Sequence, residues 1–498
     1  MRPIRKVLIA NRGEIAVRVM RTCREMGITT VAVYSDPDQA AMHVRFADEA
    51  YHIGPAASAE SYLRADRILD VAVTHGCDAV HPGYGFLSEN AGFAEACAEA
   101  GIIFIGPTPE AIRTMGDKTA ARALMEEAGV PMAPGTVDAI ADPAEARKIA
   151  REIGYPVLIK AAAGGGGKGM RVVHEDEEFV RSMEGASREA ASAFADGRVF
   201  IEKFIQEPKH IEFQVMADTH GTCVHLFERE CTIQRRHQKV VEEAPAARMT
   251  PELREAMAQA AVAAAQSCGY VGAGTVEFLL DQDGSFYFME MNTRLQVEHP
   301  VTEWITGLDL VKQQIEVAEG RPLSVKQEDL QISGHSIECR VYAEDPSNNF
   351  LPVPGHLMVH RAASGPGVRV DAGVEEGDDV QIHYDPMISK LTTWAPTREA
   401  AMDRMIRAID EYEIAGVETT LPFCRFVMGH ESFRDGTFST RFVERYFTPE
   451  DIAPSGDEDL LMAFAALQAA NSSGSAPVIA PVGGDGAAVS EWARRRRD

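Results

Sequence analysis

Two glutamates and one asparagine within residues 276–298, VEFLLDQDGSFYFMEMNTRLQVE, have a spacing that suits a metal ion. The segment predicts two strands joined at Asp283-Gly284, a dipeptide typical of a two-residue hairpin turn. In that register Glu277 faces Glu290, and Asn292 lies on the same face as Glu290. Facing carboxylates repel one another unless a cation lies between them, and Mg²⁺ accepts carboxylate and amide oxygens. We therefore expect Glu277, Glu290 and Asn292 to bind Mg²⁺ or Mn²⁺ beside a nucleotide; the alternative is a hairpin whose acids face water.

The residues that follow could bind an anion and move a proton. In NTRLQVEHP, residues 292–300, Arg294, Gln296 and Glu298 alternate, so an extended chain would point all three the same way. An arginine that holds an anion beside a glutamate that can accept a proton makes an acid–base site.

A basic segment and a histidine offer further anion-binding groups. The segment QRRHQKVVEEAPA, residues 234–246, contains four basic residues, Arg235, Arg236, His237 and Lys239. Near a nucleotide they would bind phosphate; the alternative is a charged surface. His210 alternates with Glu212 in KHIEFQV and is either part of the site or a structural histidine.

A glycine run, Gly164 to Gly169, has the spacing of GxGxxG and part of a Walker loop. Both motifs require a helix directly after the glycines, whereas the next residues, MRVV, favour a strand. We expect a turn between two strands that brings N–H groups to phosphates and closes as a lid; a plain flexible loop is the alternative. Three of the eleven lysines lie near such loop candidates: Lys118, Lys160 and Lys168. Glu202-Lys203-Phe204-Ile205 lies at a junction suited to adenine.

The elements that must position these residues fall into four stretches. Residues 1–115 alternate strands and helices, which predicts a parallel sheet with helical crossovers, and their first turn, ANRGEIA, lacks the GxGxxG of NAD sites. Residues 116–203 predict a helix over 116–131 and a small α/β unit. Residues 204–447 predict the largest unit, with helices near 251–268 and 302–319 and a β-rich stretch at 334–395. Residues 448–498 form a tail of mixed, linker-like composition.

Composition limits the partners of the chain. A net charge of −26 argues against nucleic acid or an anionic membrane as a partner. No apolar run approaches the roughly 18 residues that span a bilayer, and the N-terminus lacks the pattern of a secretory signal. The eight cysteines include no CxxC pair, which is typical of reduced thiols in a cytoplasmic protein.

Together these segments resemble the ATP-grasp superfamily and, within it, biotin carboxylase. The resemblance runs over about residues 4–447 and rests on segments such as KVLIANRGEIAVRV, HPGYGFLSEN, MGDK, IKAAAGGGGKGM, QRRHQKVVEEAPA, EMNTRLQVEHPVTE and ECRVYAEDP. It implies an α/β (α+β) chain with a Rossmann-like N-terminal domain (1–115), a linker helix and lid (116–203), a mixed-sheet C-terminal domain (204–447) and a tail (448–498). It also implies a ligase reaction in which ATP and bicarbonate form carboxyphosphate, whose carboxyl group passes to N1′ of biotin.

The resemblance implies a role for each matching residue. The ATP-binding residues would be Lys118, Lys160, Gly164, Gly165, Gly166, Gly167, Lys168, Gly169, Met170, Glu202, Lys203, Ile205, His210, Gln234 and His237. The metal ligands would be Glu277, Glu290 and Asn292. Bicarbonate and biotin would be held by Arg294, Gln296, Val297, Glu298 and Arg340. In catalysis, Glu298 would be the base, Arg340 would stabilise the biotin enolate, and Lys239 and Arg294 would contact the reacting anion.

The resemblance also implies partners. None of the lysines has the Met-Lys-Met context of a biotin-accepting hairpin, so we expect the biotin carboxyl carrier protein and a carboxyltransferase to be separate chains. We expect a homodimeric, free-standing subunit of an acetyl-CoA, propionyl-CoA or other acyl-CoA, or pyruvate carboxylase. The competing hypotheses are another ATP-grasp carboxylate ligase and an inactive nucleotide-binding subunit.

Overall fold

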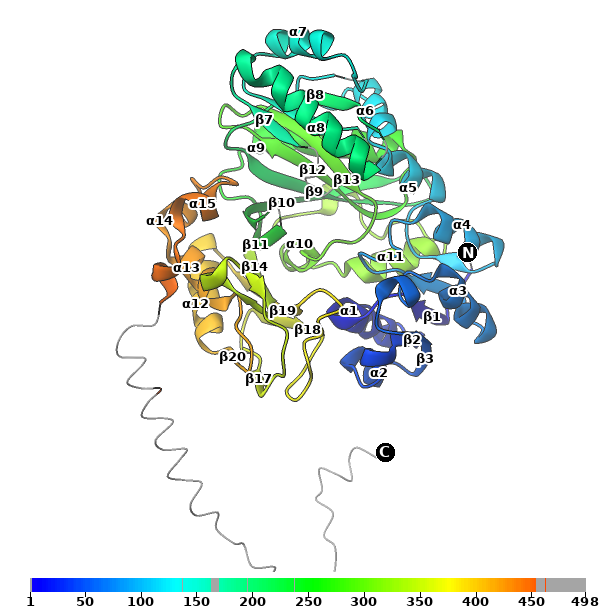
Figure 1. The fold of residues 1–498 in the computed structure, drawn as a ribbon. Helices are drawn as coiled ribbons and strands as arrows, with labels where there is room; N and C mark the ends of the chain where they lie inside the picture. Colours follow the sequence, from blue (N-terminus) through cyan, green and yellow to red (C-terminus); the bar gives the residue numbers. More distant parts are fainter. Residues whose placement is uncertain are drawn as a thin grey trace, which may run out of the picture. The chain divides into compact units, whose positions relative to one another are not determined.

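The computed structural model describes residues 2–136, 138–162, 170–194, 196–236, 238–453 and 462. The chain divides into two compact units, residues 1–451 and residues 452–498, and the first unit carries the fold (Figure 1). Of the second unit, the structure describes only residues 452, 453 and 462. The linker-like tail predicted for residues 448–498 therefore lies mostly outside the described residues.

A five-stranded parallel sheet forms the N-terminal part and confirms the predicted crossover pattern. Its order is β3-β2-β1-β4-β5, with β1 (Lys6–Ile9), β2 (Thr29–Ser35), β3 (Glu49–Gly54), β4 (Ala79–His81) and β5 (Ile103–Phe104). Its helices are α1 (Gly13–Glu25), α2 (Met42–Phe46), α3 (Ala65–Thr74), α4 (Ala91–Glu99) and α5 (Pro109–Gly116). The strands are apolar throughout because alternate residues enter two cores: Val7 packs with α1, whereas Leu8 packs with α3 and α4 on the other face.

The turn after β1 is filled by protein side chains. Arg12 Nε lies 2.6 Å from Asp38 Oδ2, and its guanidinium lies 4.2 Å from the centre of the Tyr384 ring. Tyr384 belongs to the C-terminal part of the chain, which therefore covers the turn that carries the pyrophosphate in a dinucleotide fold. This packing agrees with the absence of GxGxxG.

A small antiparallel sheet and two helices follow the first helix of the middle stretch. The strand order is β7-β6-β8, with β6 (Val157–Ala161), β7 (Arg171–Val173) and β8 (Val199–Lys203), and the helices are α6 (Lys118–Glu127), α7 (Pro143–Ile153) and α8 (Phe179–Phe194). The helix predicted over 116–131 is thus shorter, because Asp117 caps α6 by accepting hydrogen bonds from the N–H groups of Thr119 and Ala120. The strand predicted after the glycine run is confirmed as β7; the glycines themselves lie outside the described residues.

The largest sheet has eight strands in the order β13-β12-β9-β10-β11-β14-β19-β18. These are β9 (Lys209–Ala217), β10 (Cys223–Arg235), β11 (Gln238–Ala244), β12 (Gly272–Leu280), β13 (Phe286–Asn292), β14 (His335–Tyr342), β18 (Val368–Ala372) and β19 (Met387–Ala395). The expected mixed sheet is corrected here, because every strand pair in this sheet is antiparallel. The β-rich nature predicted for 334–395 is confirmed.

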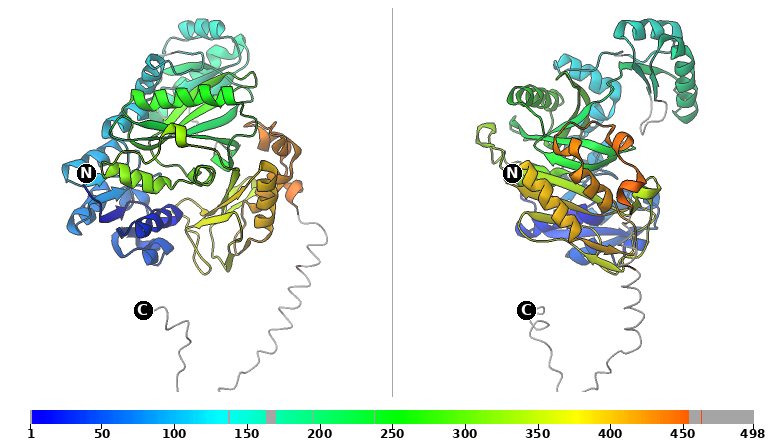
Figure 2. Two further views of the ribbon diagram at one scale, coloured as in Figure 1. Left: turned by 180° about the vertical axis from the view of Figure 1, so that it is seen from behind. Right: turned by 90° about the vertical axis from the view of Figure 1, so that its left-hand side faces the viewer.

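Helices cover both faces of this sheet (Figure 2). One face packs against α9 (Pro251–Ser267) and α12 (Arg398–Asp410). The single helix predicted near 302–319 is two helices, α10 (His299–Thr306) and α11 (Leu310–Ala318), because Gly307 adopts a left-handed φ of 73° and Asp309 caps the second. The remaining elements are α13 (Leu421–Gly429), α14 (Glu431–Arg434), α15 (Phe442–Tyr446), β15 (Glu344–Asp345), β16 (Leu351–Pro352), β17 (Val359–Arg361) and β20 (Glu413–Ala415). No helix among the described residues is long and apolar enough to span a bilayer.

Candidate active site

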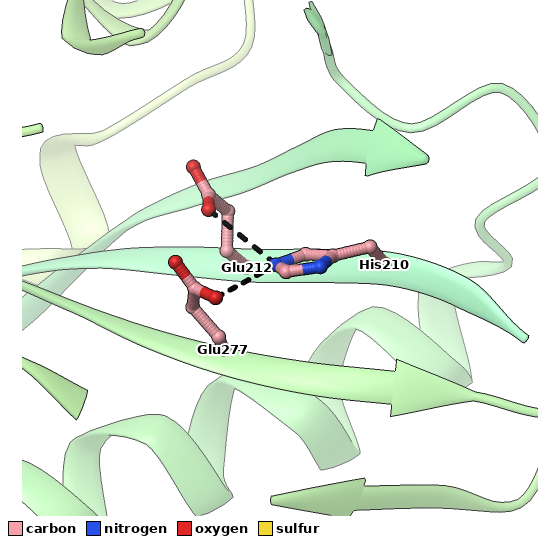
Figure 3. A group of neighbouring side chains, drawn as sticks. All are labelled: His210, Glu212 and Glu277. Atoms are coloured by element: carbon pink, nitrogen blue, oxygen red, sulfur yellow. Dashed lines mark ion pairs between the residues drawn. The ribbon is translucent and has the colours of Figure 1, made fainter. Parts of the chain in front are cut away.

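The site residues predicted from the large unit gather on one face of the eight-stranded sheet, which we call the site face. His210 and Glu212 lie two residues apart on β9, and Glu277 lies on the adjacent strand β12 as the partner of Glu212. Figure 3 shows one nitrogen of the His210 ring facing both carboxylates. His210 Nε2 lies 2.9 Å from Glu277 Oε2 and 3.9 Å from Glu212 Oε2. The alternation in KHIEFQV thus marks the site face of β9.

The turn of the β12–β13 hairpin differs from the prediction. The Asp281 N–H donates to the Ser285 carbonyl (2.8 Å), and the Gly284 N–H donates to the Asp281 carbonyl (3.1 Å). The loop therefore has three residues, with Gly284 at a φ of 89°, and the predicted two-residue turn is wrong. By itself the longer loop would shift the pairing by one residue and place Glu277 opposite Met289.

A β-bulge restores the predicted pairing of the carboxylates. Phe278 pairs with Phe288, whereas Glu277 pairs with Glu290, so Met289 is an extra residue on β13. The facing of Glu277 and Glu290 is therefore confirmed, although the turn and the bulge that produce it were not predicted. Bulges next to active sites often redirect a side chain in this way.

A second bulge brings Lys239 to the site face. Gln234 pairs with Lys239 and Ile233 pairs with Val241, which leaves Val240 as the extra residue on β11. Lys239 and Glu242 are three residues apart and would lie on opposite faces of a regular strand. The bulge places both on the site face.

Lys239 is the central cation of the site. Its Nζ lies 2.5 Å from Glu212 Oε2, 2.9 Å from Glu277 Oε1 and 2.7 Å from Glu298 Oε1. The other oxygen of Glu298 lies 2.8 Å from Arg340 Nη2. Glu298 is thus buried with one cation on each oxygen.

These contacts determine the protonation states of Glu298 and Lys239. Burial raises the pKa of Glu298, but the charges of Lys239, Arg340 and Arg229 outweigh it and hold the pKa well below 4.5. Burial lowers the pKa of Lys239, but Glu212, Glu277 and Glu298 hold it well above 10.5. Both groups are therefore charged at neutral pH. A carboxylate stabilised in this way is a weak base, and an anion that drew the cations away would strengthen it.

The segment after β13 reaches the same cluster, although residues 293–298 do not form a strand. Gln296 Nε2 donates to Glu277 Oε1 (2.7 Å), and Asn292 Nδ2 donates to the same oxygen (2.8 Å). Arg294 Nη2 donates to Asn292 Oδ1 (2.8 Å), and its Nε lies 2.9 Å from Glu89 Oε2. Arg294, Gln296 and Glu298 are thus brought together around Glu277.

The facing carboxylates fit a divalent cation. Burial and the charge of Glu277 raise the pKa of Glu290, whose side chain still reaches solvent. A solvent-open carboxylate that faces another at strand-pairing distance is the arrangement that a hard cation relieves. Asn292 fits less directly, because its oxygen accepts from Arg294. His210, Glu212 and Glu277 also lie close enough to share an ion, but Lys239 already neutralises the two glutamates.

The ATP-side residues meet where the middle stretch joins the large sheet. Lys160 on β6 and Arg122 on α6 both bind the Glu202 carboxylate, and Lys203 Nζ donates to the carbonyls of Gly154 (2.8 Å) and Tyr155 (3.1 Å). Lys118 lines a cavity of about 590 Å³ together with Asp138 and Arg198. Gln234 Nε2 lies 3.0 Å from His210 Nδ1, Ile205 is buried, and Met170 is exposed. Gly164–Gly169, including Lys168, and His237 lie outside the described residues.

Several residues of the site were not predicted from the sequence. Arg229 on β10 is fully buried and donates to Glu212, Gln214, Thr275, Gln296 and Thr302. Glu242 binds Arg340 Nε at 2.6 Å. Arg229 lies two residues before Cys231 in FEREC, and nothing in that segment separates it from a surface arginine.

Three family models match successive parts of the chain. Residues 3–112 match the N-terminal domain of biotin carboxylase, residues 117–326 match the ATP-binding domain of the carbamoyl-phosphate synthase L chain, and residues 338–445 match the C-terminal domain of biotin carboxylase. Among curated proteins, a pyruvate carboxylase subunit of Methanothermobacter thermautotrophicus is 56% identical over 441 residues, which cover 89% of this chain and 90% of that protein. Biotin carboxylase 1 of Bacillus subtilis is 53% identical over 444 residues, covering 89% and 99%.

Solved structures agree with these matches. The biotin carboxylase domain dimer of Hydrogenobacter thermophilus 2-oxoglutarate carboxylase, solved with MgADP, ADP and bicarbonate, has a TM-score of 0.86 and 50% identity, covering 91% of this chain and all of that one (100%). Biotin carboxylase of Campylobacter jejuni, solved as a β,γ-ATP complex, has a TM-score of 0.85 and 46% identity, covering 89% and 99%. The resemblance found in the sequence is confirmed: the chain belongs to the biotin carboxylase family of ATP-grasp ligases.

Proposed function

We propose that this chain uses ATP and bicarbonate to carboxylate biotin, releasing ADP and phosphate as the first half-reaction of a biotin-dependent carboxylase. The observation that carries the proposal is Glu298, held between Lys239 and Arg340 beside the facing pair of Glu277 and Glu290. This arrangement places a base and two anion-binding cations in one largely buried cluster, with a metal-binding pair that opens to solvent through Glu290.

On the nucleotide side, Glu202, Lys203 and Ile205 bind the adenine, and Gln234 and His237 bind elsewhere on the nucleotide. Lys118, Lys160 and His210 hold the phosphates, Gly164 to Gly169 close over them as the lid, and Met170 also binds ATP. Glu277 and Glu290, with Asn292 beside them, would hold Mg²⁺ or Mn²⁺, which would supply positive charge beside the transferring phosphoryl group. We propose a four-part division of the chain at residues 115, 203 and 447, with the nucleotide bound between the second and third parts.

On the bicarbonate side, Arg294, Gln296 and Val297 hold the anion and Glu298 takes its proton. As bicarbonate binds Lys239 and Arg294, those cations turn from carboxylates to the substrate, and the pKa of Glu298 rises towards its ordinary value. A bicarbonate oxygen then attacks the γ-phosphorus while the bond to ADP breaks, giving carboxyphosphate. Lys239 neutralises the negative charge that develops on this anion.

Arg340 acts in the second step. Its Nη2 faces Glu298, and it stabilises the enolate oxygen of biotin as N1′ loses its proton. The carbon–oxygen bond to phosphate breaks as the N1′–carbon bond forms, and the departing phosphate takes the N1′ proton. Arg340 is fixed for this role by Glu242 on its Nε and by Tyr342, whose hydroxyl lies 3.4 Å from Nη1.

Biotin is proposed to arrive on a separate carrier protein in the cytoplasm, and a separate carboxyltransferase to pass the carboxyl group to acetyl-CoA, another acyl-CoA or pyruvate. The chain itself is proposed to be a homodimer, which light scattering on the purified protein would measure directly. Mass spectrometry of proteins that co-purify with the tagged chain would identify the carboxyltransferase and so the acceptor.

The test is ADP release by the purified chain with MgATP and bicarbonate, with and without free biotin. We expect biotin to stimulate release strongly, and Glu298→Gln and Arg340→Ala to lower the stimulated rate at least about 100-fold, as loss of a general base or a charge-stabilising donor does. ADP release at the same rate with and without biotin would identify another ATP-grasp ligase. Absence of turnover both with free biotin and with a biotinylated carrier domain would identify an inactive subunit.

A further inference from the structure

Lys390 is buried directly behind the segment that carries Glu298. It lies on β19 with its side chain 0% exposed. Its Nζ donates to the Val297 carbonyl (2.8 Å) and lies 3.2 Å from Glu14 Oε2, at the start of α1. Lysine is seldom buried this completely, because removing an ammonium group from water costs several kcal/mol unless it is paired. The pairing joins the N-terminal helix, the large sheet and the segment before α10.

Lys390 and Arg340 act on consecutive residues of that segment. They are direct partners in the pairing of β14 with β19, so their side chains leave the same face of the sheet. Arg340 binds the Glu298 carboxylate, and Lys390 binds the carbonyl of the residue before it. Two cations placed directly opposite one another are unfavourable on a sheet. Their common target is the reason we find for this arrangement.

Holding the Val297 carbonyl also fixes the peptide that follows it. The peptide group is planar and trans, so the Glu298 N–H points away from the carbonyl that Lys390 holds. Among the residues that the structure describes, the N–H groups of Val297 and Glu298 donate to no partner. They directly precede α10, whose N-terminal end favours a negative charge.

We propose that Lys390 is a positioning residue for bicarbonate: it holds the Val297–Glu298 peptide so that the Glu298 N–H stays turned towards the anion and the Glu298 carboxylate stays between Lys239 and Arg340. This proposal rests on the proposed function, because it assigns bicarbonate to that segment. Lys390 acts through the Val297 carbonyl and does not contact the substrate. Glu14 supplies the charge that keeps the ammonium buried.

The test separates the hydrogen bond from the ion pair. Lys390→Met removes the hydrogen bond to Val297 and leaves the Glu14 carboxylate buried without its cation. The double variant Glu14→Gln/Lys390→Met also removes the hydrogen bond, but it leaves no unpaired charge buried. Lys209→Met is the matched control: Lys209 lies on the same sheet, binds buried Glu230 (2.7 Å), and does not touch residues 296–298. For each variant, biotin-stimulated ADP release gives kcat and the KM values for bicarbonate and ATP, and urea unfolding gives stability.

We expect Lys390→Met to raise the KM for bicarbonate at least about tenfold, the size of a lost hydrogen bond to a charged group, with the KM for ATP within twofold. The double variant should recover stability but keep the high KM for bicarbonate. Lys209→Met should lose stability and keep both KM values. Recovery of the wild-type KM for bicarbonate in the double variant would overturn the proposal, as would an unchanged KM in Lys390→Met. Wild-type protein without biotin-stimulated turnover would instead overturn the function on which the proposal rests.

Discussion

Two adjacent glutamates of β11 enter two different ionic clusters on opposite faces of the large sheet. Glu242 lies on the site face. The only hydrogen-bond partner of its carboxylate among the described residues is Arg340, which also binds Glu298. Glu243 lies on the reverse face, where its Oε2 atom lies 2.7 Å from His335 Nε2 and 2.6 Å from Arg398 Nε. The Glu242 Oε2 atom has no partner in the described part of the chain.

The charge balance of the two clusters explains the different protonation of these neighbours. Burial raises the pKa of Glu242 to about 7, because Arg340 offsets it only in part and Glu298 adds to it. Burial also acts on Glu243, but Arg398 and His335 outweigh it and lower the pKa to about 2. The reverse face is a closed structural network. The ionic cluster on the site face is short of cations, so a metal ion bound there would stabilise it.

The largest difference between the faces should appear when each loses a cation. Lys239→Met removes the one ammonium shared by Glu212, Glu277 and Glu298. We expect kcat for biotin-stimulated ADP release to fall about 100–1,000-fold, as on loss of a preorganised donor, and the free energy of unfolding to fall by about 3 kcal/mol. Steady-state kinetics and urea unfolding measure the two effects. A variant that kept wild-type kcat would show that Lys239 is a counterion only.

The matched change on the reverse face should affect stability alone. Arg398→Met leaves Glu243 with His335 and removes hydrogen bonds to the carbonyls of Phe433 (2.8 Å) and Arg434 (2.7 Å). We expect a similar loss of about 3 kcal/mol in unfolding free energy, because a buried carboxylate loses its main partner. At a temperature where the variant is folded, kcat and both KM values should stay within twofold of wild type. A large fall in kcat would show that the two faces are coupled through β11.

The sequence was sufficient for the parallel N-terminal sheet, which follows from the alternation of apolar strands and helices. The pairing of Glu277 with Glu290 was also predicted, but it arises because an unpredicted bulge offsets an unpredicted three-residue turn. The sequence was not sufficient where one extra residue changes the face of a strand. Val240 and Met289 are ordinary strand residues, and their bulges arise from how three or more strands pair at once.

Two further features of the structure were not predicted, for different reasons. The break between α10 and α11 had a local signal, since Gly307 and Asp309 are typical ends and starts of helices, and the apolar pattern on both sides concealed it. Arg229 and Lys390 had none, because their partners lie far along the chain: Thr302 is 73 residues from Arg229, and Val297 is 93 residues from Lys390. Only the folded sheet brings those groups together.

The smallest expected effect is on the pH dependence of the unfolding free energy, to which Glu242 and Glu243 contribute with opposite sign. The folded-state pKa of Glu242 is raised from 4.5 to about 7, so its protonated form is favoured by folding, and this contribution is lost as pH rises from 4.5 through 7. Glu242→Gln should therefore raise unfolding free energy at pH 8 by about 1–3 kcal/mol and change it little at pH 5. The folded-state pKa of Glu243 is lowered from 4.5 to about 2, so its contribution is present above pH 4.5 and lost below. Glu243→Gln should destabilise the protein equally at pH 8 and pH 6, and less at pH 4, in urea unfolding at each pH. If the change in unfolding free energy followed pH in the same way for Glu242→Gln and Glu243→Gln, both faces would balance their charges in the same way.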